Sequence, residues 1–240
     1  MSECSLKFKR VLLKLSGEAL LGQKEFGIDQ VFLQRISEEL QEVHSLGVEL
    51  AIVIGGGNIF RGVAGEKEGL NRARADYMGM LATLINALAL QDVLESRKVP
   101  VRTMSALEIK EVAETYIREK ALSHLEKGRI LILACGTGNP FFTTDTAATL
   151  RALELNCEIL MKATKVDGVY DRDPKQHPEA KKFEEITFNE VIQRNLRVMD
   201  ATAFSLARDN SLPILVFNLF QRDNIKKALF GERVGTLIKN

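Results

Sequence analysis

The chain has 240 residues, 45% of them hydrophobic, enough to bury one large α/β core or two small ones. Lys and Arg total 33 against 32 Asp and Glu, so the charge balance gives no sign of a nucleic-acid or anionic-membrane surface. The cysteines at positions 4, 135 and 157 form no C-x-x-C pair, which argues against a disulfide framework or a zinc site and favours a reducing cytoplasm.

Short apolar runs alternate with helical patterns along the chain. The first expected strand, 11–15, ends at Ser16-Gly17, and the helix after it has Asp29 as N-cap and Gly47 beyond its end. Further strands are expected at 48–54, 99–104, 129–134, 158–162, 214–218 and 236–238. The alternation predicts a largely parallel sheet with helices on both faces.

Segment 74–94 has apolar residues on nearly every side of its expected helix. Such a helix needs cover from more than one direction. We expect a core helix that also packs against a second subunit; a core helix without that contact is the alternative. The chain start lacks the apolar core of a secretory signal, and no uninterrupted apolar run reaches the roughly 20 residues of a membrane span, so we expect a soluble protein without a membrane partner.

Two Gly-rich turns follow expected strands, at 55–61 and at 134–145. Backbone N–H groups at a strand-to-helix junction favour a bound anion, and the guanidinium of Arg61 suits bidentate phosphate contact. The two turns together predict a phosphate-handling site. There is no G-x-x-x-x-G-K-[ST] motif and no complete G-x-G-x-x-G, so a P-loop kinase and a dinucleotide-binding fold are disfavoured.

Two lysines, Lys14 and Lys162, stand at expected strand ends beside Gly-rich turns. Phosphoryl transfer requires cations to offset phosphate charge, and we favour that role over side chains that reach out to solvent. Asp145 opens the helix after the second turn and either starts that helix or orients the lysines. Asp76 suits ribose hydroxyls, and Asp200 either has a functional role or caps a helix.

The polar segment 164–178 is long for a simple connection, which indicates either a ligand-binding loop or a solvated surface excursion.

A family resemblance rests on six strings: KLSGEAL at 14–20, VIGGGNIFRG at 53–62, DYMGMLAT at 76–83, GTGNPFFTTDTAA at 136–148, KATKVDGVYDRDP at 162–174 and VMDATAF at 198–204. In this order the chain resembles bacterial uridylate (UMP) kinases of the amino acid kinase family from residue 9 to 238. The resemblance implies a three-layer αβα sandwich forming one domain over 1–240. Its acceptor-binding part would span about 9–157 and its ATP-binding part about 158–240.

The resemblance further implies transfer of a phosphoryl group from MgATP to UMP, giving UDP and ADP for pyrimidine nucleotide biosynthesis. The enzyme would be a cytoplasmic homohexamer, built as a trimer of dimers. Mg²⁺ would arrive with ATP, and no protein metal ligand is expected.

Carried over by position, the resemblance assigns three groups of site residues. The catalytic group is Lys14, Arg61, Asp145, Lys162 and Asp200. The ATP-binding group is Lys14, Leu15, Ser16, Gly17, Gly57, Arg61, Thr164, Tyr170 and Asp173. The UMP-binding group is Gly56, Asp76, Thr137, Gly138, Asn139, Pro140, Phe141, Phe142, Thr143 and Thr144.

Regulation is where the resemblance weakens. The family is commonly activated by GTP and inhibited by UTP, and segment 22–27 resembles one associated with GTP activation. Bacterial relatives can carry basic effector-binding residues around positions where this chain has Gln91 and Glu95, although Arg102 and Arg129 remain. Because a triphosphate would meet fewer cations there, we expect altered or weak GTP activation.

Two alternatives stay open beside UMP kinase activity. One is a small-molecule carboxylate or carbamate kinase of the same fold, against which Asp76 and the Thr-rich second turn argue. The other is a non-catalytic nucleotide-binding regulator, against which the presence of Lys14, Asp145 and Lys162 argues.

Overall fold

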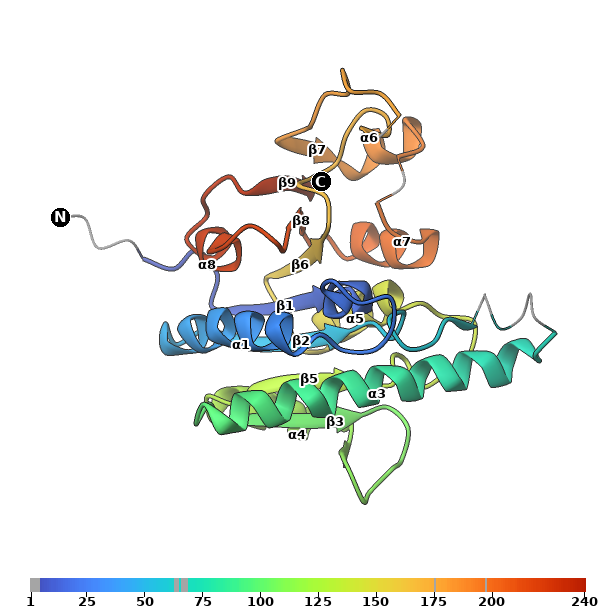
Figure 1. Cartoon of the computed structure of the whole chain (residues 1–240). Helices are drawn as coiled ribbons and strands as arrows, with labels where there is room; N and C mark the ends of the chain where they lie inside the picture. The colour runs from blue at the N-terminus through green and yellow to red at the C-terminus, as the bar shows by residue number, and fades with distance from the viewer. Residues whose placement is uncertain (1–4, 63–64, 66–68, 175, 197) are drawn as a thin grey trace.

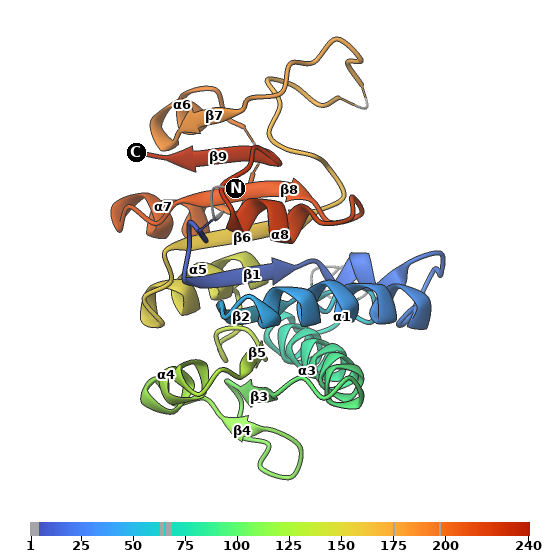
Figure 2. The ribbon, with the colours of Figure 1, turned by 90° about the vertical axis from the view of Figure 1, so that its left-hand side faces the viewer.

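A single nine-stranded sheet runs through the computed structural model, which describes residues 5–62, 65, 69–174, 176–196 and 198–240. Cys4, considered above, lies outside the described residues. The strands are β1 (Arg10–Leu15), β2 (Glu49–Ile54), β3 (Val101–Ser105), β4 (Glu114–Thr115), β5 (Ile130–Ala134), β6 (Ile159–Thr164), β7 (Glu185–Thr187), β8 (Ile214–Asn218) and β9 (Gly235–Lys239). Their spatial order is β4-β3-β5-β2-β1-β6-β8-β9-β7, and each neighbouring pair is parallel except β8 and β9 (Figures 1 and 2).

Helices cover both faces of this sheet, as Figures 1 and 2 show together. One layer contains α1 (Gln30–Ser45), α3 (Arg72–Ser96) and α8 (Asn224–Leu229), which share a core cluster. The opposite layer contains α4 (Arg118–Glu126), α5 (Thr144–Glu154), α6 (Phe188–Gln193) and α7 (Ala201–Asp209). A short 3₁₀ helix, η1 (Gly17–Leu21), follows β1. The predicted three-layer sandwich with a mainly parallel sheet is confirmed.

Strand β1 illustrates why the sheet is buried on both sides. Val11, Leu13 and Leu15 belong to the core under α1 and α3, whereas Leu12 belongs to the core under α5. Successive side chains of a strand point to opposite faces, so a central strand reads as one continuous apolar run. The same alternation turns Lys14 toward the α5 layer, together with Leu12.

The seven expected strands all form, with ends within two residues of the predicted ones. The sequence reading missed β4 and β7, which have two and three residues and are too short to show a period. The predicted cap of the first helix is confirmed, because the Asp29 carboxylate accepts hydrogen bonds from the backbone N–H groups of Val31 and Phe32. Gly47 follows the end of α1 with a φ of 78°, a conformation that favours glycine.

Helix α3 is a core helix with one exposed apolar face. By length and composition it could cross a membrane, but half of its apolar window is buried inside the fold. Tyr77, Leu81 and Ile85, each one turn after the last, are 42%, 44% and 51% exposed, and we call them the α3 stripe. The described part of the chain offers the stripe no cover, which fits the expectation that α3 meets a second subunit.

A buried glutamate on α1 makes the stability of the fold depend on pH. Glu39 is only 7% exposed, and neither of its carboxyl oxygens has a hydrogen-bond partner among the described residues. Burial raises the pKa of Glu39 from 4.5 to about 7, with Asp223 and Glu42 adding to the rise and Arg35 opposing it. The folded protein therefore holds this proton more tightly than the unfolded chain does.

We predict that Glu39→Gln stabilises the protein by about 2 kcal/mol at pH 8 and changes little at pH 4.5. In the native chain the favourable contribution of this group is fully present below pH 4.5 and is lost as the pH rises toward 7. Urea unfolding at both pH values measures the difference. Glu126→Gln, at an exposed position on α4 away from Glu39, is the matched control and should be nearly neutral at both pH values. An equal gain from Glu39→Gln at pH 4.5 and pH 8 would contradict the prediction.

Candidate active site

The register of two central strands places the predicted lysines side by side. Lys14 on β1 is the direct partner of Lys162 on the neighbouring parallel strand β6. Residues in register on adjacent strands project from the same face of a sheet. Both ammonium groups therefore point into the α5 layer, where Lys14 is only 8% exposed.

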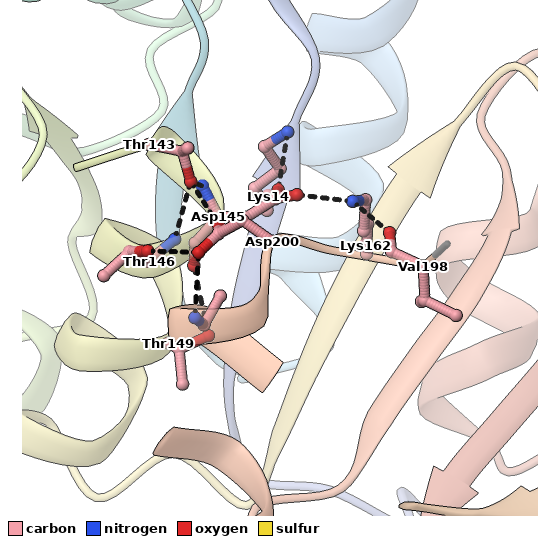
Figure 3. A network of polar contacts seen from close by, with 9 residues as sticks. Lys14, Thr143, Asp145, Thr146, Thr149, Lys162, Val198 and Asp200 are labelled. Atoms are coloured by element: carbon pink, nitrogen blue, oxygen red, sulfur yellow. Dashed lines mark hydrogen bonds and ion pairs between the residues drawn. The ribbon is translucent and has the colours of Figure 1, made fainter. Parts of the chain in front are cut away.

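Asp145, in the first turn of α5, bridges the two lysines (Figure 3). One carboxylate oxygen lies 2.9 Å from Nζ of Lys14, and the other accepts a hydrogen bond of 2.6 Å from Nζ of Lys162. Lys162 also donates to the backbone carbonyl of Val198 at 2.7 Å. Of the two sequence readings of Asp145, the structure supports the one in which its carboxylate orients both lysines.

The protonation of this cluster follows from burial and charge. Burial by itself would raise the pKa of Asp145, but the charges and hydrogen bonds of Lys14 and Lys162 outweigh it and hold that pKa below its usual value. Burial lowers the pKa of Lys162, as does the neighbouring charge of Lys14, while Asp145 opposes the shift. The site thus holds the ionised carboxylate of Asp145 between the side chains of Lys14 and Lys162.

The backbone of the first Gly-rich turn lies in close contact with the segment that follows β1. A Cβ placed on Gly17 would lie 2.5 Å from the carbonyl oxygen of Gly55, and one on Gly56 would lie 2.8 Å from that of Gly79 in α3. Only glycine allows these close backbone approaches. Arg61 donates to the Glu18 carboxylate across the same region. Two segments that are distant in sequence are therefore adjacent in the fold. One contains Lys14, Ser16 and Gly17, and the other contains Gly56, Gly57 and Arg61.

The second Gly-rich turn leads into the N-terminus of α5. Cys135, Gly136, Gly138 and Phe141 all have positive φ, from 59° to 81°. Asp76 of α3 accepts a hydrogen bond of 2.8 Å from the backbone N–H of Phe141 and further bonds from Arg72. Thr137 forms hydrogen bonds within this loop, to Asn139, and Gly138 packs against Ala106. The loop ends at Thr143, whose hydroxyl caps α5 by accepting from two backbone N–H groups.

Two cavities flank the group formed by Lys14, Asp145 and Lys162, which we call the lysine cluster. One, of about 390 Å³, is lined by residues that include Gly56, Gly57, Arg61, Asp76, Thr137, Phe142, Thr143 and Thr144. The other, of about 470 Å³, is lined by residues that include Lys162, Thr164, Tyr170, Asp173 and Val198. Asp145 follows Thr144 of the first cavity directly and bonds to Lys162 of the second. The charged cluster therefore lies where the two cavities approach each other.

The carboxylate of Asp200 bonds to the ends of two helices and not to the lysines that we expected beside it. Its side chain caps α7 through the backbone N–H of Ala203 and accepts from the hydroxyls of Thr143 at 2.5 Å and Thr146 at 2.9 Å (Figure 3). Within the described residues, its carboxylate forms no hydrogen bond or ion pair with Lys14 or Lys162. Asp200 therefore ties the N-terminus of α7 to that of α5.

Some predicted site residues have side chains that point into the core or form hydrogen bonds with nearby residues of the chain. The side chain of Leu15 points into the core under α1, so only its backbone faces the turns, and its carbonyl accepts from Gly55 N–H. Thr164 bonds to Val166, and Tyr170 donates to Asp167 at 2.6 Å. Pro140 follows Asn139 on the partly exposed part of the second loop.

Residues that the sequence reading did not single out also contribute. Glu18 holds Arg61, Thr146 holds Asp200, and Thr83 and Asn86 of α3 bond to the two Gly-rich turns. Glu18 and Thr83 lie inside strings quoted for the family resemblance, but nothing in their local spacing marks a contact far along the chain.

Together these features can support transfer of a phosphoryl group between two bound molecules. Two lysines and the N-terminus of α5 supply positive potential, and the Gly-rich turns expose backbone N–H groups near it. Such a reaction depends mainly on positioning and on electrostatic stabilisation of phosphate oxygens.

Comparisons with known proteins agree with this interpretation. Residues 9–218 match the amino acid kinase family. The structure is similar to UMP kinase from Bacillus anthracis, with 44% identity, a TM-score of 0.94 and coverage of 97% of this chain and 96% of that one. It is also similar to UMP kinase from Ureaplasma parvum, with 35% identity, a TM-score of 0.93 and coverage of 98% and 100%.

A more distant similarity is to uridylate kinase from Archaeoglobus fulgidus, with 27% identity, a TM-score of 0.72 and coverage of 95% of this chain and 99% of that one. The paired lysines, the Gly-rich turns and strands β1 to β8 lie within the matched residues 9–218, and only β9 of the described strands follows them. The chain belongs to the amino acid kinase family.

Proposed function

We propose that this protein transfers the terminal phosphoryl group of MgATP to UMP, forming ADP and UDP. The observation that carries the proposal is the pair of lysines in register on β1 and β6, bridged by Asp145 and flanked by two cavities. The similarity to two UMP kinases over nearly the whole chain supports UMP as the acceptor. The reaction would serve pyrimidine nucleotide biosynthesis in the cytoplasm.

ATP would occupy the larger cavity, in the part of the chain from about 158 to 240. Thr164, Tyr170 and Asp173 line that cavity and would surround the base, with Lys162 at its inner end. The triphosphate would extend toward the backbone of Leu15, Ser16 and Gly17. Gly57 and Arg61 would lie between the two nucleotides.

UMP would occupy the smaller cavity, in the part from about 9 to 157. Asp76 would receive the ribose hydroxyls, and Gly56 and the loop from Thr137 through Gly138, Asn139, Pro140, Phe141, Phe142 and Thr143 to Thr144 would surround the base and phosphate. Asp76 already holds the backbone of Phe141, so ribose binding and loop position would be linked through one carboxylate.

Lys14 and Lys162 would neutralise charge that develops on the transferred phosphoryl group and on the bridging oxygen. Asp145 would keep both ammonium groups aimed at that position, and Asp200 would hold the N-terminus of α5 in place through Thr143 and Thr146. No water needs to be activated, because the acceptor is itself a phosphate oxygen.

Mg²⁺ would be bound mainly by ATP. Within the described residues no group of three or more His, Cys, Asp or Glu side chains could hold a metal ion. Asp145 is engaged by two lysines, and Asp200 by two threonines. These residues fit an ion that arrives with ATP, and such an ion would supply positive charge to the phosphates.

Turnover with a panel of acceptors tests the proposal. We would measure ADP release from MgATP with UMP, CMP, dTMP, AMP, acetylglutamate and carbamate. Selective turnover with UMP, accompanied by UDP formation, is the expected result. Turnover with another acceptor would reassign the smaller cavity, and none with any acceptor would favour a nucleotide-binding regulator.

The protein would act as a homohexamer. The exposed α3 stripe supports an interface with a second copy, because one helix face carries three large apolar side chains in a row. Sedimentation at micromolar concentration should give an oligomer, and a monomer as the sole species would refute the assembly.

We predict that GTP activates the enzyme only weakly and that UTP inhibits it. Gln91 donates to Glu95 at 2.8 Å on α3, so this part of the helix presents neutral and acidic groups where a triphosphate would need cations. Turnover and UMP affinity should change less than about twofold when GTP is added at saturating ATP. A rise of several-fold in either quantity would show that effector cations come from elsewhere.

A further inference from the structure

We propose that Thr83 is a positioning residue for the second Gly-rich turn, acting through the backbone of Cys135. The proposal rests on the proposed function, in which this turn opens the loop that binds UMP. Thr83 lies in the middle of α3, is 3% exposed and forms part of the lining of the smaller cavity. It is distant in sequence from the lysine cluster and carries no charge.

The hydroxyl of Thr83 uses both of its hydrogen-bonding capacities. It donates to the carbonyl of Met80 at 2.7 Å, within α3, and accepts from the backbone N–H of Cys135 at 2.8 Å. The bond to Met80 fixes the direction of the hydroxyl hydrogen, so the lone pairs of the oxygen are free to accept from the Cys135 N–H. Thr83 therefore connects the rigid helix to one defined backbone atom at the end of β5.

That atom belongs to a turn which needs external support. Cys135 has a φ of 61° and is completely buried, and Gly136 follows it with a φ of 59°. A non-glycine residue pays about 1–2 kcal/mol for the left-handed conformation. The bond from Thr83 offsets part of that cost and so selects the conformation that sends residues 136–144 toward the cavity.

Helix α3 supports the first Gly-rich turn in the same way, so side chains of this helix hold the backbone of both turns. Asn86, one turn after Thr83 and fully buried, donates to the carbonyl of Gly55 at 2.8 Å. Its amide also exchanges two hydrogen bonds with Asn58, of 2.7 and 2.9 Å. Neighbouring side chains of one helix thus contact both turns, whose glycines have no side chains with which to fix themselves.

The main test is Thr83→Val, which replaces the hydroxyl by a methyl group of similar size. The Cys135 N–H then loses its acceptor, and the loop from 136 to 144 relaxes. We expect kcat/KM for UMP to fall roughly tenfold or more, because a misplaced positioning group can cost up to about a hundredfold. KM for ATP should stay within about twofold of the wild-type value, since the larger cavity does not include this loop.

Two controls separate positioning from packing. Thr83→Ser keeps the hydroxyl and should retain most of the UMP activity, whereas a packing role would leave the isosteric valine variant active and impair the serine variant, which lacks the methyl group. Thr103→Val removes a hydroxyl that is equally buried on β3 but has no hydrogen-bond partner among the described residues, so its activity should match wild type. If Thr83→Val folds poorly, Thr83→Ala replaces it in the same measurements.

Hydrogen exchange at the Cys135 amide provides a readout that does not need catalysis. Exchange should be faster by tenfold or more in Thr83→Val and close to wild type in Thr83→Ser and Thr103→Val. Unchanged exchange together with unchanged UMP kinetics would overturn the proposal, as would equal rises in the KM values of UMP and ATP. If wild type fails to phosphorylate UMP, the proposed function fails, and the exchange rates alone still decide whether Thr83 holds the turn.

Discussion

Lys14→Met is expected to lower kcat by at least about a hundredfold, as does loss of one preorganised electrostatic donor in other enzymes. The methionine keeps most of the length of the unbranched side chain, so β1 stays packed while the ammonium group is removed. Asp145 retains Lys162 as a partner and leaves no new unpaired charge. Because the lost interaction is strongest in the transition state, KM for UMP and ATP should change much less than kcat.

Steady-state kinetics with both substrates varied would measure this effect. Lys226→Met serves as the matched control, because Lys226 is exposed on α8, outside both cavities. Its kcat should equal that of wild type. A folded Lys14→Met enzyme with unchanged kcat would show that Lys14 has only a structural role in the cluster.

Asp145→Asn is expected to damage both stability and activity. In the native site one carboxylate lies between two buried ammonium groups, at 2.9 and 2.6 Å. An amide has the same shape but removes the negative charge, so two like charges remain buried without compensation. Loss of one partner of a buried charged group costs about 3–5 kcal/mol, and kcat should also fall about a hundredfold because the lysines lose their orientation.

Urea unfolding measures the change in stability, with Asp209→Asn as control because Asp209 is exposed at the end of α7. The control should stay within about 0.5 kcal/mol of wild type. The pH dependence gives an independent check on the origin of the effect. The lowered pKa of Asp145 means that its contribution is present above 3.8 and is lost as the pH falls through the lower pKa of the folded state.

The stability difference between wild type and Asp145→Asn should therefore shrink when both are compared in strong acid. A difference that is as large in acid as at neutral pH would point to a loss of packing instead of a loss of charge.

Local patterns were sufficient for the elements that depend on neighbouring residues. The apolar run 11–15 gave a central strand, and Asp29 gave the cap of α1, because strand burial and helix capping are decided within a few positions of the chain. The two Gly-rich turns could also be recognised in the sequence, because glycine and threonine at a strand-to-helix junction indicate exposed backbone N–H groups. The family resemblance extended this reading to a full set of site residues.

The sequence by itself thus determined the alternation of strands and helices and the two Gly-rich turns that we propose bind phosphate. Only the tertiary structure decided which side chains face each other: the register that pairs Lys14 with Lys162, the two threonines that bind Asp200, and the burial of Glu39. These contacts join positions up to 148 residues apart, from 14 to 162, and depend on how strands align and helices pack. No periodicity encodes that alignment, because it results from the packing of the whole core.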